Sequence, residues 1–268
     1  MATVTHPPPD PQPDHHEDLF GKRLVRSPRP QTVRVFAHEP DLLTGLDGHT
    51  ANVLRRRVTV RTRYLQAGAW VPPDDLGPGA LGLLVLDGLL IRCVELDGRE
   101  CPELVGAGDL VRPWDQADEL FSLPHTTSWR VLRPAWLAVL DSAFANVVAR
   151  FPTILGALLS RSTARARTLS LTLAIAHVRH AETRLLMLLW HLADRWGRMT
   201  PDGVLVTLPL THELLAHLTC MRRPTASTAL GQLTRAGQLA RHSDGSWLLT
   251  GSPPQPPTRP ATAVMPLP

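Results

Sequence analysis

The chain has few cysteines and no long hydrophobic run, and these absences exclude several classes of protein. Three cysteines in 268 residues, Cys93, Cys101 and Cys220, are too few and too widely spaced for a disulfide framework or a thiolate metal cluster. No stretch of about 18 consecutive apolar residues is present, and the first residues lack the basic and apolar pattern of a leader. We therefore expect a soluble cytoplasmic protein with no membrane association, no metal site and no cofactor.

The overall composition is that of a globular protein, but the charge is uneven. Hydrophobic residues make up 43% and charged residues 19% of the chain, which excludes disorder over its full length. The length predicts one large or two ordinary domains. Residues 151–250 contain 11 arginines against 5 acidic residues, whereas residues 1–150 are slightly acidic. A basic second half suggests a polyanionic partner.

Prolines concentrate at the two ends of the sequence. Fourteen of the 26 prolines lie in residues 1–30 and 251–268. Proline fixes φ and removes a backbone donor, and few aliphatic side chains surround these prolines. We therefore predict disordered proline-rich tails over residues 1–19 and 251–268.

Residues 20–134 contain short apolar segments separated by turn residues, which is typical of an antiparallel barrel or sandwich. The clearest hairpin is predicted over residues 81–94, as two apolar runs around an Asp87-Gly88 turn. The pair Val53-Leu54 is another strand candidate. We predict that this part of the chain is all-β.

After Pro134 the apolar period changes to that of helices. A short helix is predicted from Trp136 to Phe144 and a long one from Pro152 to His177. The face opposite the apolar seam of the long helix is polar, which favours a dimer helix over one buried against its own domain. The seam residues recur at alternating steps of four and three, as in a two-stranded coiled coil: Leu155, Leu159, Ser162, Ala166, Leu169 and Leu173.

Residues 179–250 have the element order of a winged helix-turn-helix domain. A helix from Glu182 to Trp196 is followed by a strand over residues 204–208. Thr211 then caps a short helix, and a second helix is predicted from Arg223 to Ala236. Residues 238–249 form a predicted hairpin, the wing.

The amino-terminal end of the second helix carries the side chains expected to contact DNA. Arginine and hydroxyl side chains at that position donate to phosphates and base edges in a major groove. The cap residue of the preceding helix and two residues near the wing tip complete the predicted DNA-binding set: Thr211, Arg222, Arg223, Thr225, Ser227, Thr228, Arg241 and His242.

The segment LPLTHELLAHLTCMRRPTASTALGQLTRAGQL, residues 208–239, resembles the helix-turn-helix pattern of the Crp/Fnr transcription regulators. The resemblance extends over about residues 40–250. It places Arg223 at the family's base-reading arginine and Thr225 at its threonine. Pro224 and Thr228 replace the usual glutamate and second arginine, so the family's typical target sequence is not carried over.

The resemblance implies an α+β fold with three parts. These are an antiparallel jelly-roll β-barrel like a cyclic-nucleotide-binding domain over residues 20–134, a short helix with a dimerisation helix over 135–178, and a winged helix-turn-helix over 179–250. Gly88 and Gly108-Asp109-Leu110 match turns of the family's barrel.

The residues with which family members bind a cyclic nucleotide are missing. Where those members have a Gly-Glu pair, this chain has Val111-Arg112-Pro113-Trp114, and no arginine stands in the later segment 124–128. Losing a guanidinium contact to phosphate costs a few kcal/mol, so we predict no useful binding of cyclic AMP. The cysteine cluster of the fumarate-nitrate branch is also absent, because no cysteine precedes Cys93.

The resemblance implies a homodimeric, sequence-specific DNA-binding regulator of transcription that acts on a near-palindromic operator. Its implied partners are double-stranded DNA, a second copy of the chain and RNA polymerase, with an effector that the sequence does not identify. No catalytic motif is found, so an enzyme is not predicted. The alternative is a small-molecule or redox sensor whose winged helix mainly binds a protein partner. A steep salt dependence of binding distinguishes DNA from such a partner.

Overall fold

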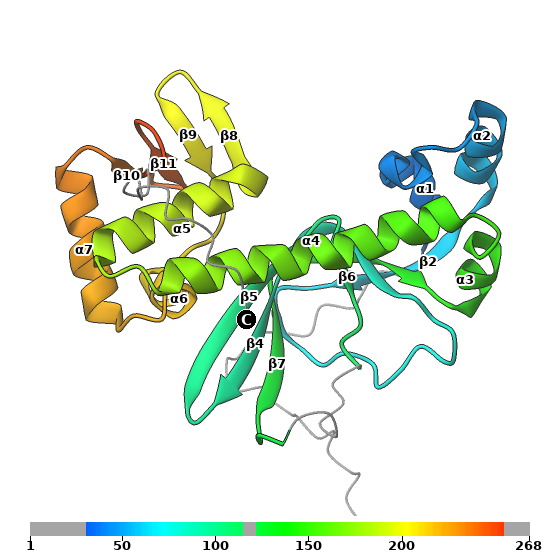
Figure 1. Cartoon of the computed structure of the whole chain (residues 1–268), viewed down its shortest axis with the longest axis horizontal. Helices are drawn as coiled ribbons and strands as arrows, with labels where there is room; N and C mark the ends of the chain where they lie inside the picture. The colour runs from blue at the N-terminus through cyan, green and yellow to red at the C-terminus, as the bar shows by residue number, and fades with distance from the viewer. Residues whose placement is uncertain (1–30, 115–121, 255–268) are drawn as a thin grey trace, which may run out of the picture.

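The computed structural model describes residues 31–114 and 122–254, and it contains two antiparallel sheets joined by a long helix (Figure 1). The predicted α+β class is confirmed. Within the described ranges, no helix is long and apolar enough to cross a membrane. The predicted tails over residues 1–19 and 251–268 lie outside the described residues, except for residues 251–254.

The first sheet has seven strands in the order β1-β2-β7-β4-β5, with β3 paired to β7 and β6 paired to β4. Its core side chains include Leu83, Leu90 and Val131. The path of pairing does not close among the described residues, so the sheet is not the closed barrel that the sequence predicts. Its strands are β1 Thr32–Val33, β2 Val60–Leu65, β3 Gly68–Trp70, β4 Gly82–Leu96, β5 Arg99–Gly106, β6 Leu110–Val111 and β7 Thr126–Leu140.

The predicted hairpin turn at Asp87-Gly88 is wrong, because β4 runs through it as one strand. The register against β7 shifts around these two residues, which marks an irregularity of the bulge type. Gly88 has φ +101°, and a Cβ atom there would lie 2.4 Å from the Cα of Ala135. The glycine therefore serves a close approach of two strands. The turn lies instead at Asp97-Gly98, where both residues have positive φ, as a type I′ hairpin turn requires.

The predicted strand at Val53-Leu54 is also wrong, because these residues lie in helix α2, Gly48–Arg57. The Asp47 carboxylate accepts from the backbone N–H groups of His49 and Thr50, at 3.1 and 3.0 Å. This is an N-cap, and Leu54 is the buried side chain of the helix. Two further elements precede it, helix α1 at Val35–His38 and the short 3-10 helix η1 at Pro40–Leu43.

The helix predicted to begin at Trp136 begins later, because β7 continues to Leu140 and therefore crosses the predicted domain boundary at residues 134/135. Trp136 pairs with Tyr64 of β2, and their ring centroids are 5.0 Å apart. Helix α3, Ser142–Val148, starts where the Asp141 carboxylate accepts from the N–H of Phe144 at 3.1 Å.

The predicted long helix is observed as α4, Pro152–Ala176, which lies across the first sheet and leads to the second domain (Figure 1). Ile154 and Leu158 near its start pack into the core beside α1 and α3, and Ile175 near its end packs into the core of the second domain. Both ends of α4 are therefore held by apolar contacts.

The second domain has the predicted winged helix-turn-helix order, with one additional strand. Its core includes Leu185, Leu215 and Trp247. The additional strand, β8, follows α5 directly and completes a second sheet in the order β10-β11-β9-β8. The elements are α5 Ala181–Trp196, β8 Gly197–Thr200, β9 Gly203–Val206, α6 His212–Leu218, α7 Arg223–Arg235, β10 Leu239–Arg241 and β11 Trp247–Leu249.

Candidate nucleic-acid interface

Helix α7 has one apolar face and one exposed face. Pro224 lies in its first turn, where the missing N–H has no intrahelical partner to lose. Four side chains on the inner face are buried against α5 and α6: Ala226, Ala229, Leu230 and Leu233. This burial fixes which side of α7 faces solvent.

The solvent side of α7 presents most of the residues predicted to contact DNA. Arg222, Arg223, Thr225 and Thr228 are exposed. In the described part of the chain, neither Arg222 nor Arg223 makes a hydrogen bond or an ion pair. The Thr228 hydroxyl donates to the carbonyl of Pro224 at 3.0 Å, whereas Ser227 is half-buried. The first turn of α7 therefore offers two unpaired guanidinium groups and one free-facing threonine, Thr225.

The predicted wing residues lie beside this turn. Arg241 ends β10, and its guanidinium lies 5.2 Å from the ring centroid of the buried Trp247. His242 is exposed at the start of the turn, which the Asp244 carboxylate closes by accepting from the N–H and hydroxyl of Ser246. The stacking holds Arg241 in place without neutralising its charge.

His212, which the sequence analysis did not select, connects the three parts of this surface. It opens α6, its Nδ1 lies 3.1 Å from the Ser227 hydroxyl of α7, and its ring is 6.0 Å from that of Trp247 in the wing. Burial and the charges of Arg241 and Arg223 lower the pKa of His212 below its ordinary value. The imidazole is therefore neutral at pH 7 and orders Ser227. Its place next to the cap residue was the one signal in the sequence.

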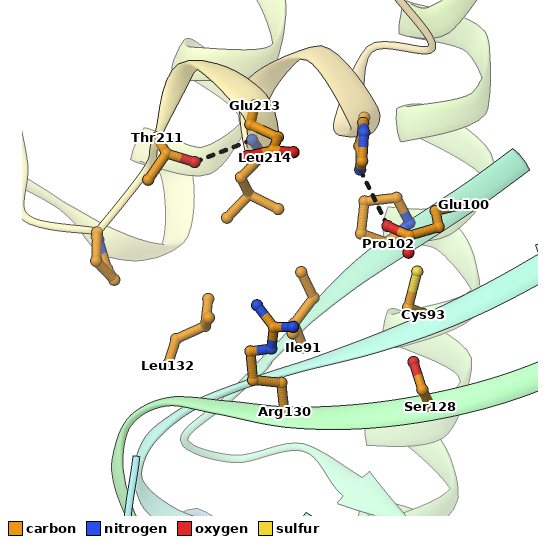
Figure 2. Close-up of a pocket in the computed structure, with 12 residues that line it drawn as sticks. Ile91, Cys93, Glu100, Pro102, Ser128, Arg130, Leu132, Thr211, Glu213 and Leu214 are labelled. Atoms are coloured by element: carbon orange, nitrogen blue, oxygen red, sulfur yellow. Dashed lines mark hydrogen bonds and ion pairs between the residues drawn. The ribbon is translucent and has the colours of Figure 1, made fainter. Parts of the chain in front are cut away.

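Thr211 is placed differently from the other predicted DNA-binding residues. Its hydroxyl accepts from the N–H of Leu214 at 3.1 Å, as predicted for a cap. The residue also lines a cavity of about 350 Å³ between α6 and the first sheet, together with Ile91 and Leu132 (Figure 2). Thr211 thus faces the front domain, whereas Arg223 lies at the start of α7.

The two domains are joined on both sides of that cavity. His217 of α6 lies 3.2 Å from the Glu100 carboxylate of β5. Arg195 of α5 pairs with the buried Asp109 at 2.9 Å and donates to the carbonyl of Ala107 at 2.7 Å. The position of α6 and α7 is therefore coupled to strand β5 and the turn after it.

The predicted seam of α4 is exposed over its whole length. Leu159 and Leu173 are 69% and 61% exposed, and Leu155 and Leu169 are 36% and 38% exposed. Ser162 and Ala166 at the centre of the seam are exposed as well. The other side of α4 contacts the chain itself, because Arg161 pairs with Glu39 at 2.6 Å. The apolar side of α4 therefore has no partner within the described residues.

A cavity of about 270 Å³ lies between α4 and the first sheet, and its arginines are already paired. Arg165 binds Glu103 through both Nε and Nη2, and Arg92 lies 3.6 Å from the same carboxylate. Arg112 is exposed and donates to the carbonyl of Ala80 at 2.6 Å.

The three cysteines are free thiols. The register pairs Cys93 with Pro102 and Cys101 with Val94, so the two side chains point to opposite faces of the β4-β5 hairpin. Burial and nearby carboxylates raise the pKa of Cys93 to about 11, and burial also raises the pKa of Cys101. Both thiols are protonated at neutral pH and are weak nucleophiles. The described residues contain no group of three or more His, Cys, Asp or Glu side chains able to hold a metal ion.

Comparisons with known proteins agree with this architecture. The family model described as "Crp-like helix-turn-helix domain" matches residues 183–249. No curated protein matches the chain.

Several solved structures share the fold at low sequence identity. A CooA mutant from Carboxydothermus hydrogenoformans is 19% identical with a TM-score of 0.56, covering 72% of this chain and 84% of that one. FixK2 from Bradyrhizobium japonicum is 15% identical with a TM-score of 0.56, covering 72% and 94%. A cyclic nucleotide-binding domain containing protein from Listeria monocytogenes is 16% identical with a TM-score of 0.58, covering 81% and 97%.

These findings confirm the resemblance stated from the sequence. The matched proteins include transcriptional regulators of the CRP/FNR family, and none of the comparisons points to an enzyme. Residues 183–249 form a Crp-like helix-turn-helix domain, and the chain as a whole has the fold of the CRP/FNR transcription regulators.

Proposed function

We propose that this protein is a homodimeric transcription regulator that binds a near-palindromic operator through the amino-terminal turn of α7. The observation that carries the proposal is the pair of exposed, unpaired arginines, Arg222 and Arg223, at the start of a helix whose opposite face is buried. Because the inner face of α7 is fixed, its outer face is available to a major groove.

The wing supports the same surface. Arg241 and Arg223 both lower the pKa of His212, so both guanidinium groups lie near that side chain. A recognition helix that contacts bases and a wing that contacts an adjacent phosphate need such a common edge. We assign Arg223 and Thr225 to base contacts, and Arg222, Arg241 and His242 to the backbone.

The second copy of the chain would pack on the exposed seam of α4. Leu155, Leu159, Leu169 and Leu173 present a continuous apolar stripe on a helix of 25 residues. Two recognition helices related by a twofold axis would then contact half-sites about 34 Å apart. Contact with RNA polymerase, implied by the family resemblance, also belongs to this proposal.

The protein would act without cyclic AMP. In the helix-facing cavity, Arg92 and Arg165 share Glu103, so these guanidinium groups are not free for a cyclic phosphate. Asp109 is likewise engaged by Arg195 and by the N–H of Gly106 at 2.8 Å. Calorimetric titration with cyclic AMP should show no micromolar binding, and a micromolar dissociation constant would overturn this part of the proposal.

Footprint titration against salt tests the proposal against a protein partner for the winged helix. Binding through about six phosphate contacts should weaken steeply and log-linearly as salt rises. The variant Arg222→Ala should reduce that slope by about one phosphate contact. Binding that is insensitive to salt would instead favour an apolar protein interface.

A further inference from the structure

A groove lined by tryptophan and proline lies at the edge of the first sheet, away from α4 and from the DNA-binding surface. It encloses about 530 Å³ where β3 pairs with one end of β7. Val71 in its rim is 89% exposed, the largest exposure among the described large hydrophobic side chains. We call it the Trp groove, defined by Trp70, Val71, Pro72, Pro113, Trp114 and Trp129.

Two buried polar groups beside the groove have no partner. The indole Nε1 of Trp129 and the hydroxyl of Thr127 make no hydrogen bond with any described residue, and both residues line the groove. Trp129 is only 6% exposed, and its ring packs edge-on against Trp70 at 5.5 Å. Buried indole N–H and hydroxyl groups nearly always have partners. The groove therefore lacks an acceptor-rich ligand.

A proline-rich segment has the chemistry that such a groove requires. In the polyproline II conformation, proline rings pack on aromatic side chains, and the backbone offers carbonyl acceptors without competing N–H donors. Residues 7–13 of this chain contain five prolines in seven positions. We propose that the Trp groove binds residues 7–13 of the same chain, with Trp129 and Thr127 donating to carbonyl groups of that segment.

The amino-terminal segment is long enough to reach the groove. The described chain begins at Gln31, whose carbonyl accepts from the N–H of Thr62 at 2.7 Å. Thr62 pairs with Ala138 of β7, and Trp129 lies nine residues further along that strand, a distance of about 30 Å. The 18 residues from Pro13 to Gln31 span up to about 56 Å when extended at ~3.1 Å per residue.

The prolines at the other end of the sequence are less suited. They follow Pro254, which lies beside Ile175 and Trp190, and these two residues contribute to the core of the DNA-binding domain. Tethering through residues 14–30 also raises the effective concentration of residues 7–13 at the groove to about the millimolar range. A weak contact is then enough to keep the groove occupied.

Fluorine NMR of the full chain labelled with 5-fluorotryptophan tests this proposal. Changing Pro7, Pro8, Pro9, Pro11 and Pro13 to glycine should shift the resonances of Trp70, Trp114 and Trp129. The resonances of Trp136 and Trp247, which lie outside the groove, should stay unchanged. If none of the three groove resonances moves, the proposal is wrong.

A peptide of residues 5–16 provides the second arm. Added to the glycine variant, it should restore the original groove resonances in a saturable way. Thr127→Val should weaken that binding about 2- to 10-fold because one hydrogen bond is lost, whereas Thr126→Val, on the other face of β7, should not. Three outcomes overturn the assignment: no saturable binding, equal binding of a peptide of residues 252–261, or resonances that depend on protein concentration, which would assign the segment to a second copy.

Discussion

The arginines of α4 and those at the start of α7 teach different lessons, although both helices lie in the basic half of the chain. Arg161 and Arg165 of α4 are half-buried and bind Glu39, Asp41 and Glu103 of the front domain. Arg222 and Arg223 are exposed and make no ion pair within the described residues. Charge in the sequence therefore does not mark a DNA contact by itself. The absence of an internal partner does.

The strongest way to sharpen this comparison is to charge the apolar side of α4. Replacing Leu159 and Leu173 by glutamate should raise the dissociation constant of the dimer about a thousandfold, because apolar area is lost and like charges meet across the seam. Analytical ultracentrifugation measures this effect. Thr168→Glu, on the polar side of the same helix, is the matched control. An unchanged dimer in the leucine variant would contradict the assignment of the seam.

Removing a paired arginine of α4 should damage stability. Arg165→Ala leaves the Glu103 carboxylate, which is about 10% exposed, with only the 3.6 Å contact to Arg92. The free energy of unfolding should fall by about 3 kcal/mol. Arg61→Ala, whose pair with Asp141 is largely exposed, should cost about 1 kcal/mol or less. Urea titration measures both, and equal losses would mean that the buried pair contributes no more than a surface pair.

Removing an unpaired arginine of α7 should instead damage binding. Arg223→Ala should weaken binding to the specific site by about 1–3 kcal/mol while leaving the unfolding free energy nearly unchanged. Arg235→Ala, at the other end of α7, should have little effect on binding, since its Nε donates to the carbonyl of Gly231 in its own helix. Competition titrations on specific and random duplexes separate the roles. An equal loss on both duplexes would make Arg223 a phosphate contact.

The smallest effect concerns pH. The pKa values of His191 and His212 are both lowered, mainly by burial, from an ordinary value of 6.5. The unfolded chain then binds more protons below pH 6.5 than the folded one, so stability should fall as pH decreases from 7 to 5.5.

Changing both histidines to glutamine should flatten that dependence in urea titrations. The carboxyls with lowered pKa, Asp47 and Asp244, act below this window, since their ordinary value is 3.8. Stability that rises on acidification from pH 7 to 5.5 would show that burial does not hold these imidazoles neutral.

The two halves also differ in how far the sequence determines them. In the DNA-binding domain the signals are local: the Thr211 cap, the first-turn Pro224 and the Asp244-Gly245 turn each predict a feature that is observed. The exposed face of α7 follows from the period of its apolar residues.

In the front half the deciding contacts are distant in sequence. Gly88 is read as a turn from its neighbours, but its conformation is set by Ala135 on another strand. Trp136 continues a helical pattern, yet pairing with Tyr64 keeps it in β7. The links of Arg165 to Glu103 and of His212 to Ser227 and Trp247 likewise exist only after folding.

The central claim is that the unpaired surface of α7 reads DNA sequence without a small molecule. Selection from a randomised duplex pool by the purified protein at moderate salt, with no ligand added, tests it most directly. We predict enrichment of an inverted repeat with half-site centres about one helical turn apart, and loss of that enrichment in Arg223→Ala. Recovery of random sequences by folded, dimeric protein would contradict the claim.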